Sequence, residues 1–271
     1  MTTPGEDSLN GSTAPSSPVI QTHPLPDTQP ELPSDEFADR SDSLDTIAQD
    51  YTIEILMTHL SPAGRAPFMN ESSEDADINP SEDALALSSS LGITELFPPH
   101  LTTLDAYSFS PCGYSCNALL KWRDNTGADS ARSGEGYYTI HVTPEEGWSY
   151  ASFECNVPLP TDPAEKACRI PDLKTLIRRV VNIFQPGRLT LTLFVSSEDN
   201  STAEEEGGES AVEAAQRAFK AALTLPRGRL ANGDAETQKT GGFTGIYKRT
   251  DKINYEFGGY DLAFASFELR S

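Results

Sequence analysis

Two short stretches of the chain combine the residue types that nucleophilic and proton-transfer chemistry require. The stretch PCGYSCN holds Cys112, Ser115 and Cys116, and the later stretch TIHVTPE holds His141 and Glu145. A serine beside an imidazole can act as a nucleophile with its general base, because a neutral imidazole accepts a proton near neutral pH. Thiols and imidazoles are also ligands that zinc prefers. The residues therefore suggest a nucleophile with its base, a metal site, or part of a larger arrangement.

The spacing of these residues argues against the first two interpretations. Cys112, Cys116 and His141 lack a second close pair of ligands, whereas structural zinc usually takes four ligands. Ser115 lies in Gly-Tyr-Ser-Cys-Asn, and the nucleophile elbow of hydrolases has a glycine where Asn117 stands. We therefore predict no metal here. A serine hydrolase that uses Ser115 and His141 stays an alternative, which labelling with a fluorophosphonate would test.

The composition divides the chain into a polar arm and a folded part. Among the first fifty residues, which are rich in Pro, Ser, Thr and acids, Arg40 is the only Lys or Arg. Such a segment cannot bury enough apolar surface to offset the entropy of ordering it. We predict a disordered arm over residues 1–45 and one domain over residues 46–271. Polar insertions into that domain are predicted near residues 71–90, 123–135 and 198–240.

The charge of the chain limits the partners that it can have. The net charge is -21 and the pI is near 4.4, so nucleic acids and anionic membranes repel this protein and neither is a predicted partner. Cationic small ligands are compatible with this acidity. The sequence shows no hydrophobic signal peptide and no apolar run of the roughly 18–20 residues that span a bilayer. We expect a cytoplasmic protein whose four cysteines are reduced.

Several segments alternate between apolar and polar residues, which is typical of half-buried strands. The predicted strands are Tyr51–Leu60, for which a helix is the alternative, Asn117–Trp122, Gly136–Pro144, Trp148–Val157 and Arg188–Ser196. The C-terminal stretch predicts two further strands around a turn at Gly258–Gly259.

Two helices are predicted among these strands. The first follows Asp172, whose carboxylate can accept N–H groups of the first turn, and it ends at Pro186–Gly187. Its apolar stripe consists of Leu173, Leu176, Ile177, Val180, Val181 and Phe184. The second is an Ala-rich helix over Ser210–Leu223. This order of elements indicates an α+β fold with a largely antiparallel sheet and flanking helices.

Four stretches together resemble the S-adenosylmethionine decarboxylase family, the pyruvoyl-dependent enzymes of polyamine synthesis. They are DYTIEILM, FSPCGYSCNALL, YYTIHVTPEEGWSYASFECN and IRRVVNIFQPGRLTLTLFV, and they follow the order of the eukaryotic type. The insertions and the GWSY variant resemble fungal members. The resemblance spans Asp50 to about Phe267 and implies the C-terminal half of a four-layer α/β/β/α sandwich. In such a half, the inner sheet face is expected to be apolar and without its partner sheet.

The resemblance implies a role for each residue of the cluster. In this family a proenzyme cleaves itself at a Glu-Ser bond, and the serine becomes a pyruvoyl group that accepts electrons as CO2 leaves the substrate. His141 matches the histidine that removes a proton during self-processing, and Ser115 matches the serine that hydrogen-bonds in that step. Phe109 matches an aromatic ring that stacks on adenine, and Glu145 matches the carboxylate that binds the ribose hydroxyls.

The resemblance also implies a site for the activator putrescine. Asp50, Thr52, Glu54 and Glu154 match the acidic site of animal and fungal members. Because putrescine carries two ammonium groups, several carboxylates are needed to bind it, and a buried acid cluster without its cation is costly.

The family's N-terminal half supplies the cleavage serine, a second stacking aromatic and a proton-donating cysteine, for which this chain has no matching motif. A Glu-Ser-Ser sequence occurs at Ser72, but it follows the TIEILM strand, so we do not assign Ser72 as the pyruvoyl source.

We therefore predict a carboxy-lyase by resemblance, which supplies aminopropyl groups for spermidine and spermine and is inactive as this chain alone. The expected partners are S-adenosylmethionine, putrescine, the N-terminal half or a full-length decarboxylase, and a second copy in a complete homodimer. The alternative is a catalytically dead regulatory subunit that binds an active decarboxylase. A truncated gene model would be the simplest explanation of the missing half.

Overall fold

The structure is a computed structural model that describes residues 50–70, 79–123, 133–161, 170–197, 209–224 and 245–270. The chain divides into two units, Met1–Ser43 and Leu44–Ser271. The predicted arm and the Glu-Ser-Ser sequence lie outside the described residues. All elements below belong to the second unit.

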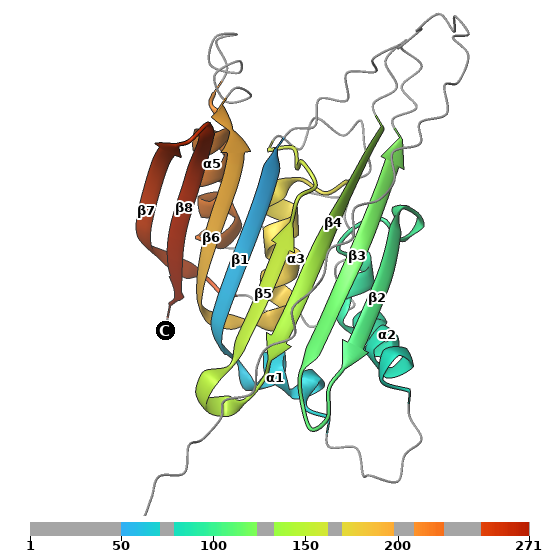
Figure 1. Ribbon diagram of the computed structural model, residues 1–271. Helices are drawn as coiled ribbons and strands as arrows, with labels where there is room; N and C mark the ends of the chain where they lie inside the picture. The colour runs from blue at the N-terminus through green and yellow to red at the C-terminus, as the bar shows by residue number, and fades with distance from the viewer. Residues whose placement is uncertain are drawn as a thin grey trace, which may run out of the picture. The chain divides into compact units, whose positions relative to one another are not determined.

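The described strands form one antiparallel sheet of eight strands in the order β2-β3-β4-β5-β1-β6-β8-β7 (Figure 1). The bounds are β1 (Tyr51–Leu60), β2 (Thr102–Ser108), β3 (Tyr114–Arg123), β4 (Ser133–Thr143), β5 (Tyr150–Cys155), β6 (Pro186–Ser196), β7 (Tyr247–Phe257) and β8 (Tyr260–Leu269). Strand β2 was not predicted, but the other strands were. The α+β fold with a largely antiparallel sheet is confirmed.

The α-helices lie on one side of this sheet (Figure 1). They are α1 (Pro62–Arg65), α2 (Pro80–Leu91), α3 (Leu173–Phe184) and α5 (Ala211–Leu223). The chain also forms the short 3-10 helices η1 (Ala66–Phe68), η2 (Ile93–Glu95), η3 (Pro99–Leu101) and η4 (Glu146–Trp148). Within the described part of the chain, no helix combines the length and the hydropathy needed to cross a membrane.

Helix α3 forms as its sequence predicts. Asp172 is its N-cap and accepts a hydrogen bond from the backbone N–H of Thr175 at 3.0 Å. All six residues of the predicted stripe are buried, because the stripe faces the sheet. The helix ends at Gln185, which takes the left-handed conformation with φ 47°, so β6 begins directly at Pro186.

Helix α3 also connects the neighbouring helices through two arginines. The guanidinium of Arg178 donates to the carbonyls of Ala221 and Ala222 at 2.9 and 3.2 Å, near the C-terminus of α5. The guanidinium of Arg179 donates to the carbonyls of Glu95 and Leu96 at 2.9 and 3.0 Å. Cations stabilise the free carbonyls at a helix end, so both contacts hold the helical layer together.

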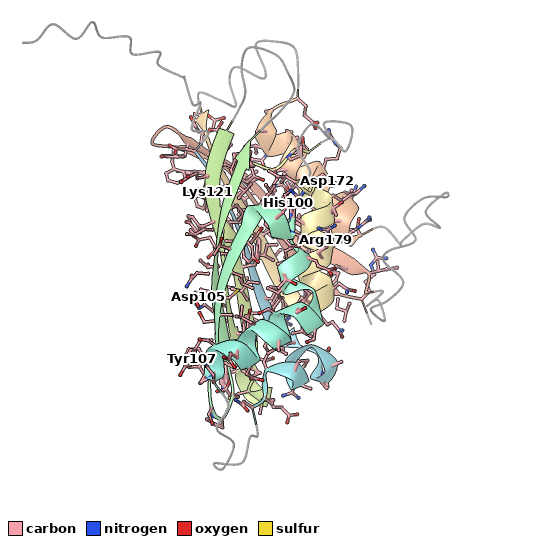
Figure 2. The ribbon with its side chains drawn as sticks, turned by 90° about the vertical axis from the view of Figure 1, so that its right-hand side faces the viewer. His100, Asp105, Tyr107, Lys121, Asp172 and Arg179 are labelled. Carbon is pink, nitrogen blue, oxygen red and sulfur yellow. The ribbon has the colours of Figure 1, made fainter. Side chains whose placement is uncertain are left out.

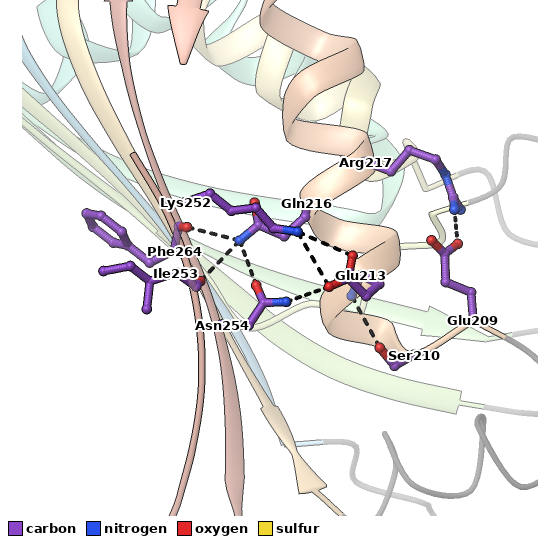
Figure 3. A network of polar contacts seen from close by, with 9 residues as sticks. All are labelled: Glu209, Ser210, Glu213, Gln216, Arg217, Lys252, Ile253, Asn254 and Phe264. Atoms are coloured by element: carbon purple, nitrogen blue, oxygen red, sulfur yellow. Dashed lines mark hydrogen bonds and ion pairs between the residues drawn. The ribbon is translucent and has the colours of Figure 1, made fainter. Parts of the chain in front are cut away.

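Helix α5 is attached to the β7–β8 hairpin by a polar network (Figure 3). The buried side-chain amide of Gln216 donates to the carbonyls of Ile253 and Phe264 at 3.2 and 2.9 Å, and so contacts both strands. Glu213, nearly one turn earlier, accepts a hydrogen bond from Asn254 at 2.7 Å. The hairpin is therefore fixed to the helical layer by side chains as well as by strand pairing.

The predicted polar insertions contain regular elements, and their being insertions stays a prediction. Residues 80–91 form helix α2, which begins at the N-cap Asn79 and stops at Gly92 with φ 77°. Its fully buried residues, Ala84 and Ser88, are small, and Leu87 and Leu91 are only partly buried against the core, so no strong apolar stripe marked it in the sequence. The insertion near residues 123–135 overlaps the ends of β3 and β4, and the one near residues 198–240 contains α5, itself a predicted helix.

The sheet face away from the helices, here called the open face, differs from the expected apolar surface. Figure 2 shows Asp105 and Tyr107 on this face, and Arg179 on the helical side. The centre of the open face is mainly polar, although Leu56 also lies there, and it includes Ser115, Thr139, His141, Ser152, Glu154, Thr52, Glu54, Thr190 and Thr192. Apolar side chains gather toward its β7 edge, namely Phe194, Leu262, Phe264, Ile253, Tyr255 and Phe257. The expectation is therefore wrong for the centre of the face.

Candidate functional site

Strand register places four of the candidate residues, Ser115, His141, Glu54 and Glu154, in two cross-strand rows on the open face. The dyad row joins Tyr107, Ser115, His141 and Ser152 on β2, β3, β4 and β5. The carboxylate row joins Asp105, Asn117, Thr139, Glu154, Glu54 and Thr192 across six strands. On β2, β3, β4 and β5, which carry both rows, the two rows are separated by two residues along the strand, which is about 7 Å.

Ser115 and His141 are in direct contact within the dyad row. The Ser115 Oγ lies 3.0 Å from the His141 Nδ1, and both side chains are accessible from the open face. Ser115 stands inside β3 rather than on a turn from a strand to a helix, so the geometry of a hydrolase elbow is absent at this serine. The pair can exchange a proton, and its imidazole can accept one from a bound molecule.

The cysteines beside this pair do not join it. Cys116 follows Ser115 on β3 and therefore points to the opposite face of the sheet, where it is buried. Burial raises the pKa of the Cys116 thiol to about 11. Because His141 lies on the open face, Cys116 and His141 cannot bind one zinc ion.

A fixed loop presents Phe109 at the end of β2. The N–H of Phe109 donates to the carbonyl of Gly113 at 3.0 Å, and the N–H of Gly113 donates to the carbonyl of Phe68 at 3.0 Å. Gly113 has φ 114°, a conformation that suits glycine. The ring of Phe109 is 46% exposed and packs against Tyr107, with centroids 4.9 Å apart and an angle of 57°. The loop therefore offers an aromatic surface beside the dyad row.

Glu145 lies close to the same loop. It precedes η4, where the N–H of Trp148 donates to the Glu145 carbonyl at 3.2 Å. The pKa of the Cys112 thiol is raised, first by burial and then by the charge and hydrogen bonding of Glu145. Since Cys112 belongs to the loop of Phe109, Phe109 and Glu145 stand at one end of the sheet with the dyad.

Helix α2 supports the strand that carries Ser115. The hydroxyls of Ser88 and Tyr114 are hydrogen-bonded at 2.6 Å in the core, and Ser88 also donates to the carbonyl of Ala84 at 2.6 Å. Tyr114 directly precedes Ser115 and points to the opposite face. The buried contact therefore fixes β3 from the side away from the site.

A pair of carboxylates forms the centre of the carboxylate row. Glu54 on β1 is directly opposite Glu154 on β5, and both are half-buried. The pKa of Glu54 is raised, first by burial and then by the charge of Glu154. The hydroxyl of Tyr137 donates to Glu154 Oε1 at 2.8 Å. Thr52 lies two residues before Glu54, on the same face of β1.

Asp50 lies at a distance from this pair. Its carboxylate accepts a hydrogen bond from the Tyr260 hydroxyl at 3.0 Å, and its carbonyl accepts one from the N–H of Ser196 at 3.1 Å. It precedes Glu54 by four residues, which is about 13 Å along an extended chain. The structure thus brings Glu54 and Glu154 together and places Asp50 near the far end of β1.

Two tyrosines of the site were not among the candidates from the sequence. Tyr107 packs on Phe109, and Tyr137 binds Glu154. The alternation of β4 would have placed Tyr137 on the same face as His141, whereas Tyr107 lies on β2, which was not predicted. It does not show which residue of the next strand stands opposite, so their partners could not be found.

The carboxylate pair has a consequence for stability. We expect Glu54→Gln to raise the free energy of unfolding at pH 7 by about 0.5–1 kcal/mol, the scale of a like-charge cross-strand pair. The folded-state pKa of Glu54 is above its ordinary value of 4.5, so the folded protein binds more protons than the unfolded one. Stability therefore falls as the pH rises from about 4.5 through the raised pKa. Urea denaturation at several pH values measures this slope, which the variant should lose.

Asp105→Asn is the matched control for this substitution. It removes one negative charge from the same row, where Asn117 rather than a carboxylate stands opposite. An equal gain in both variants would show that the effect comes from net charge and not from the pair.

Comparison with known proteins agrees with this geometry. A family model described as adenosylmethionine decarboxylase matches residues 29–268, beginning inside the predicted arm. The S-adenosylmethionine decarboxylase proenzyme of Saccharomyces cerevisiae is 32% identical over 166 residues, which are 56% of this chain and 38% of that protein. The Xenopus laevis proenzyme is 35% identical over 147 residues, 54% of this chain and 34% of that protein. The fungal origin stays a prediction, since relatives from a fungus and an animal both match.

A solved structure shows the same fold. This chain superposes on the crystal structure of the Trypanosoma brucei AdoMetDC-delta26 monomer with a TM-score of 0.52 and 18% sequence identity. The superposition covers 82% of this chain and 66% of the Trypanosoma brucei chain. The chain spans between a third and two-fifths of the two curated relatives described above. Because the family model covers most of the sequence, the chain belongs to the adenosylmethionine decarboxylase family.

Proposed function

We propose that this chain carries a substrate-binding and self-processing part of a pyruvoyl-dependent S-adenosylmethionine decarboxylase. The observation that supports this most strongly is the 3.0 Å contact between Ser115 Oγ and His141 Nδ1 on the open face. The loop of Phe109 and the carboxylate of Glu145 stand at the same end of the sheet. This combination suits a substrate that has an aromatic base, ribose hydroxyls and a positive charge.

Each side chain has a distinct task in this proposal. In this proposal Nδ1–H of His141 donates to Ser115 Oγ, so Nε2 is unprotonated and takes the proton removed during self-processing. Phe109 stacks on the adenine ring, and its face attracts the nearby sulfonium. Glu145 accepts hydrogen bonds from the ribose hydroxyls, which are stronger because the acceptor is ionised. Ser115 orients the imidazole and hydrogen-bonds in the processing step.

The pyruvoyl group of this family would supply a carbonyl that accepts electrons during decarboxylation. The open face fits such a group, because Ser115 and His141 are exposed there and a second sheet could carry the group toward them. No motif of this chain matches the cleavage serine or the proton donor. We therefore expect the purified chain to release no CO2 from carboxyl-labelled S-adenosylmethionine, and release would contradict this part of the proposal.

Binding of S-adenosylmethionine by the chain tests the site itself. We expect Phe109→Ala to weaken binding about tenfold, because the stacking of a base on an aromatic ring is worth roughly 1–3 kcal/mol. Glu145→Gln should weaken it to a similar degree, since hydrogen bonds to charged groups contribute about 1.5–3 kcal/mol. Calorimetric titration measures both affinities.

Leu119→Ala is the control for these variants. Leu119 is 60% exposed on the open face and lies outside the dyad row, so its removal should leave the affinity unchanged. If the wild type does not bind, or if all three variants bind equally well, the proposed substrate site is wrong.

The carboxylate pair supports a second role as a diamine site, and putrescine is the ligand that the resemblance suggests. Glu54 and Glu154 both come from this chain, so a diamine could be bound without the catalytic serine. This observation favours the regulatory subunit as a second candidate function. A regulatory subunit should form a stable complex with an active decarboxylase and change its turnover in a putrescine-dependent way, whereas a part of the enzyme should do neither.

A further inference from the structure

We infer that Tyr137 gives the two carboxylates of the diamine site unequal roles. It favours Glu154 as the first ligand of an ammonium group, and it directs the first proton that the pair binds as the pH falls to Glu54. The part of this inference that concerns diamines rests on the proposed function. The part that concerns the proton depends only on the contacts within the chain.

The position of Tyr137 is fixed by the end of β5. Its N–H donates to the side-chain oxygen of Asn156 at 2.7 Å, and its carbonyl accepts a hydrogen bond from the N–H of Asn156 at 3.2 Å. Asn156 stands two residues after Glu154 in the sequence. These two bonds hold the backbone of Tyr137 where its hydroxyl reaches Glu154 Oε1 at 2.8 Å.

The hydrogen bond from Tyr137 makes the pair asymmetric. Glu154 receives a hydroxyl donor that favours its ionised form, because a hydrogen bond to a carboxylate stabilises the charge. Among the described residues, no hydrogen bond to the carboxylate of Glu54 is found. Two carboxylates in register cannot both be ionised without repulsion, so the less stabilised one takes the proton. That one is Glu54.

The pKa values of the neighbouring groups agree in direction with this assignment. The pKa of Tyr137 is raised, first by its hydrogen bond to Glu154 and then by burial, so the phenol keeps its proton and remains a donor. The pKa of Glu54 is raised by burial and by the charge of Glu154.

The other groups around the pair do not neutralise it. Thr192 on β6 stands opposite Glu54, and Thr139 on β4 stands opposite Glu154. His141 is the diagonal neighbour of Glu154, because it pairs with Ser152. No lysine or arginine stands opposite either carboxylate in the strand register of the described residues. Within these strands the pair thus lacks a cationic partner, and an ammonium group of a ligand would supply one.

A diamine supplies that cation and displaces the proton. The ammonium group first binds the ionised Glu154, and its charge then favours ionisation of Glu54. The proton of Glu54 passes to the solvent, and Glu54 becomes a second ligand of the alkyl diammonium ion. Binding should therefore release protons at a pH at which Glu54 is partly protonated.

A titration of the chain by NMR tests the proton assignment without a ligand. The side-chain carboxyl carbons of ¹³C-labelled glutamates are followed while the pH is lowered, and Glu54→Gln and Glu154→Gln assign the two signals. In the wild type, the Glu54 carbon should shift first. In Tyr137→Phe, which keeps the ring and loses the donor, the two titrations should lie closer together, although burial still raises the pKa of Glu54. An unchanged separation between the two titrations in Tyr137→Phe would overturn the inference.

The diamine part is tested with 1,4-diaminobutane by calorimetry in two buffers of different ionisation enthalpy. The wild type should release protons when it binds the diamine. Tyr137→Phe should bind the diamine about tenfold more weakly and should release a different number of protons for each diamine bound. Tyr255→Phe, a change at a 60% exposed tyrosine on the same face, should behave as the wild type does. A wild type that binds without releasing protons would overturn the inference. If no diamine binds while the carboxyl carbons titrate in the expected order, the proposed diamine site fails and the assignment of the proton stands.

Discussion

Replacing Phe153 with alanine is expected to lower the free energy of unfolding by about 3–5 kcal/mol, the range for a buried aromatic side chain. Phe153 is 0% exposed on β5, in the middle of the sheet. Its ring stacks on Tyr138 with centroids 5.8 Å apart, and Tyr138 stacks on Phe97 at 5.6 Å. The cavity left by the ring would lie inside this stack, where the backbones of the neighbouring strands prevent collapse.

Urea denaturation followed by circular dichroism measures this loss. Trp148→Ala is the control, because Trp148 precedes the same strand and is 87% exposed, so its removal should change stability by no more than about 0.5 kcal/mol. Equal losses in the two variants would mean that the stack on the helical side of the sheet is not the core of this domain. Phe153 also lies between Ser152 and Glu154, so a disordered β5 would disturb both rows of the site.

Replacing Gly64 with alanine is expected to destabilise the protein by about 2–3 kcal/mol, although alanine is the better helix former. A Cβ atom at Gly64 would lie 2.2 Å from the carbonyl oxygen of Phe184 and 2.8 Å from its carbonyl carbon. These are backbone atoms at the end of α3, so no side-chain rotation can relieve the clash. The approach is close because Ser61, the N-cap of α1, donates its N–H to the carbonyl of Gln185 at 3.0 Å.

Thermal and urea denaturation of Gly64→Ala and Gly147→Ala separate this clash from a general effect of glycine. An added Cβ at Gly147 meets no atom within 4 Å, so that variant should keep the stability of the wild type. A gain in stability for Gly64→Ala would show that helix propensity outweighs the contact and that α1 is not pressed against α3.

Elements with a strong local pattern could be predicted from the sequence. Ile53 and Ile55 alternate with Thr52 and Glu54, and the structure buries both isoleucines completely in β1. The stripe of α3 was equally clear, because its apolar side chains recur at helical spacing. In both cases the neighbours along the chain decide the structure, so no knowledge of distant contacts was needed.

Elements that depend on distant contacts were missed. Helix α2 buries Ser88 because Tyr114, which is far away in sequence, offers its hydroxyl at 2.6 Å. Strand β2 lies at the edge of the sheet and has only Ala106 and Ser108 buried, so its alternation is weak. A sequence pattern cannot show that a polar side chain has a buried partner, and such segments therefore look like polar insertions.

In the candidate site, too, the residue types could be predicted from the sequence, whereas the contacts between distant residues could not. The types of Ser115 and His141 suggested a pair, but the 3.0 Å contact depends on how β3 is aligned with β4. The predicted diamine set came from the resemblance and joined Glu154 of β5 with Asp50, Thr52 and Glu54, and the alternation of β1 places Asp50 and Glu54 on the same side. It does not bring them together, because β1 is extended. The register of β1 and β5, which spacing along one strand does not show, places Glu154, already in the predicted set, opposite Glu54.

The cross-strand rows determine where this protein can change length during evolution. Successive side chains of a strand point to opposite faces, so the loss of one residue from β3 would turn Ser115 toward the helices and replace it with a neighbour. Every residue of the site on that strand would change face at once. An insertion between Arg123 and Ser133 lies beyond the paired residues and leaves Ser115 opposite His141. Lineages should therefore gain and lose residues in the connections while the lengths of β3, β4 and β5 stay constant.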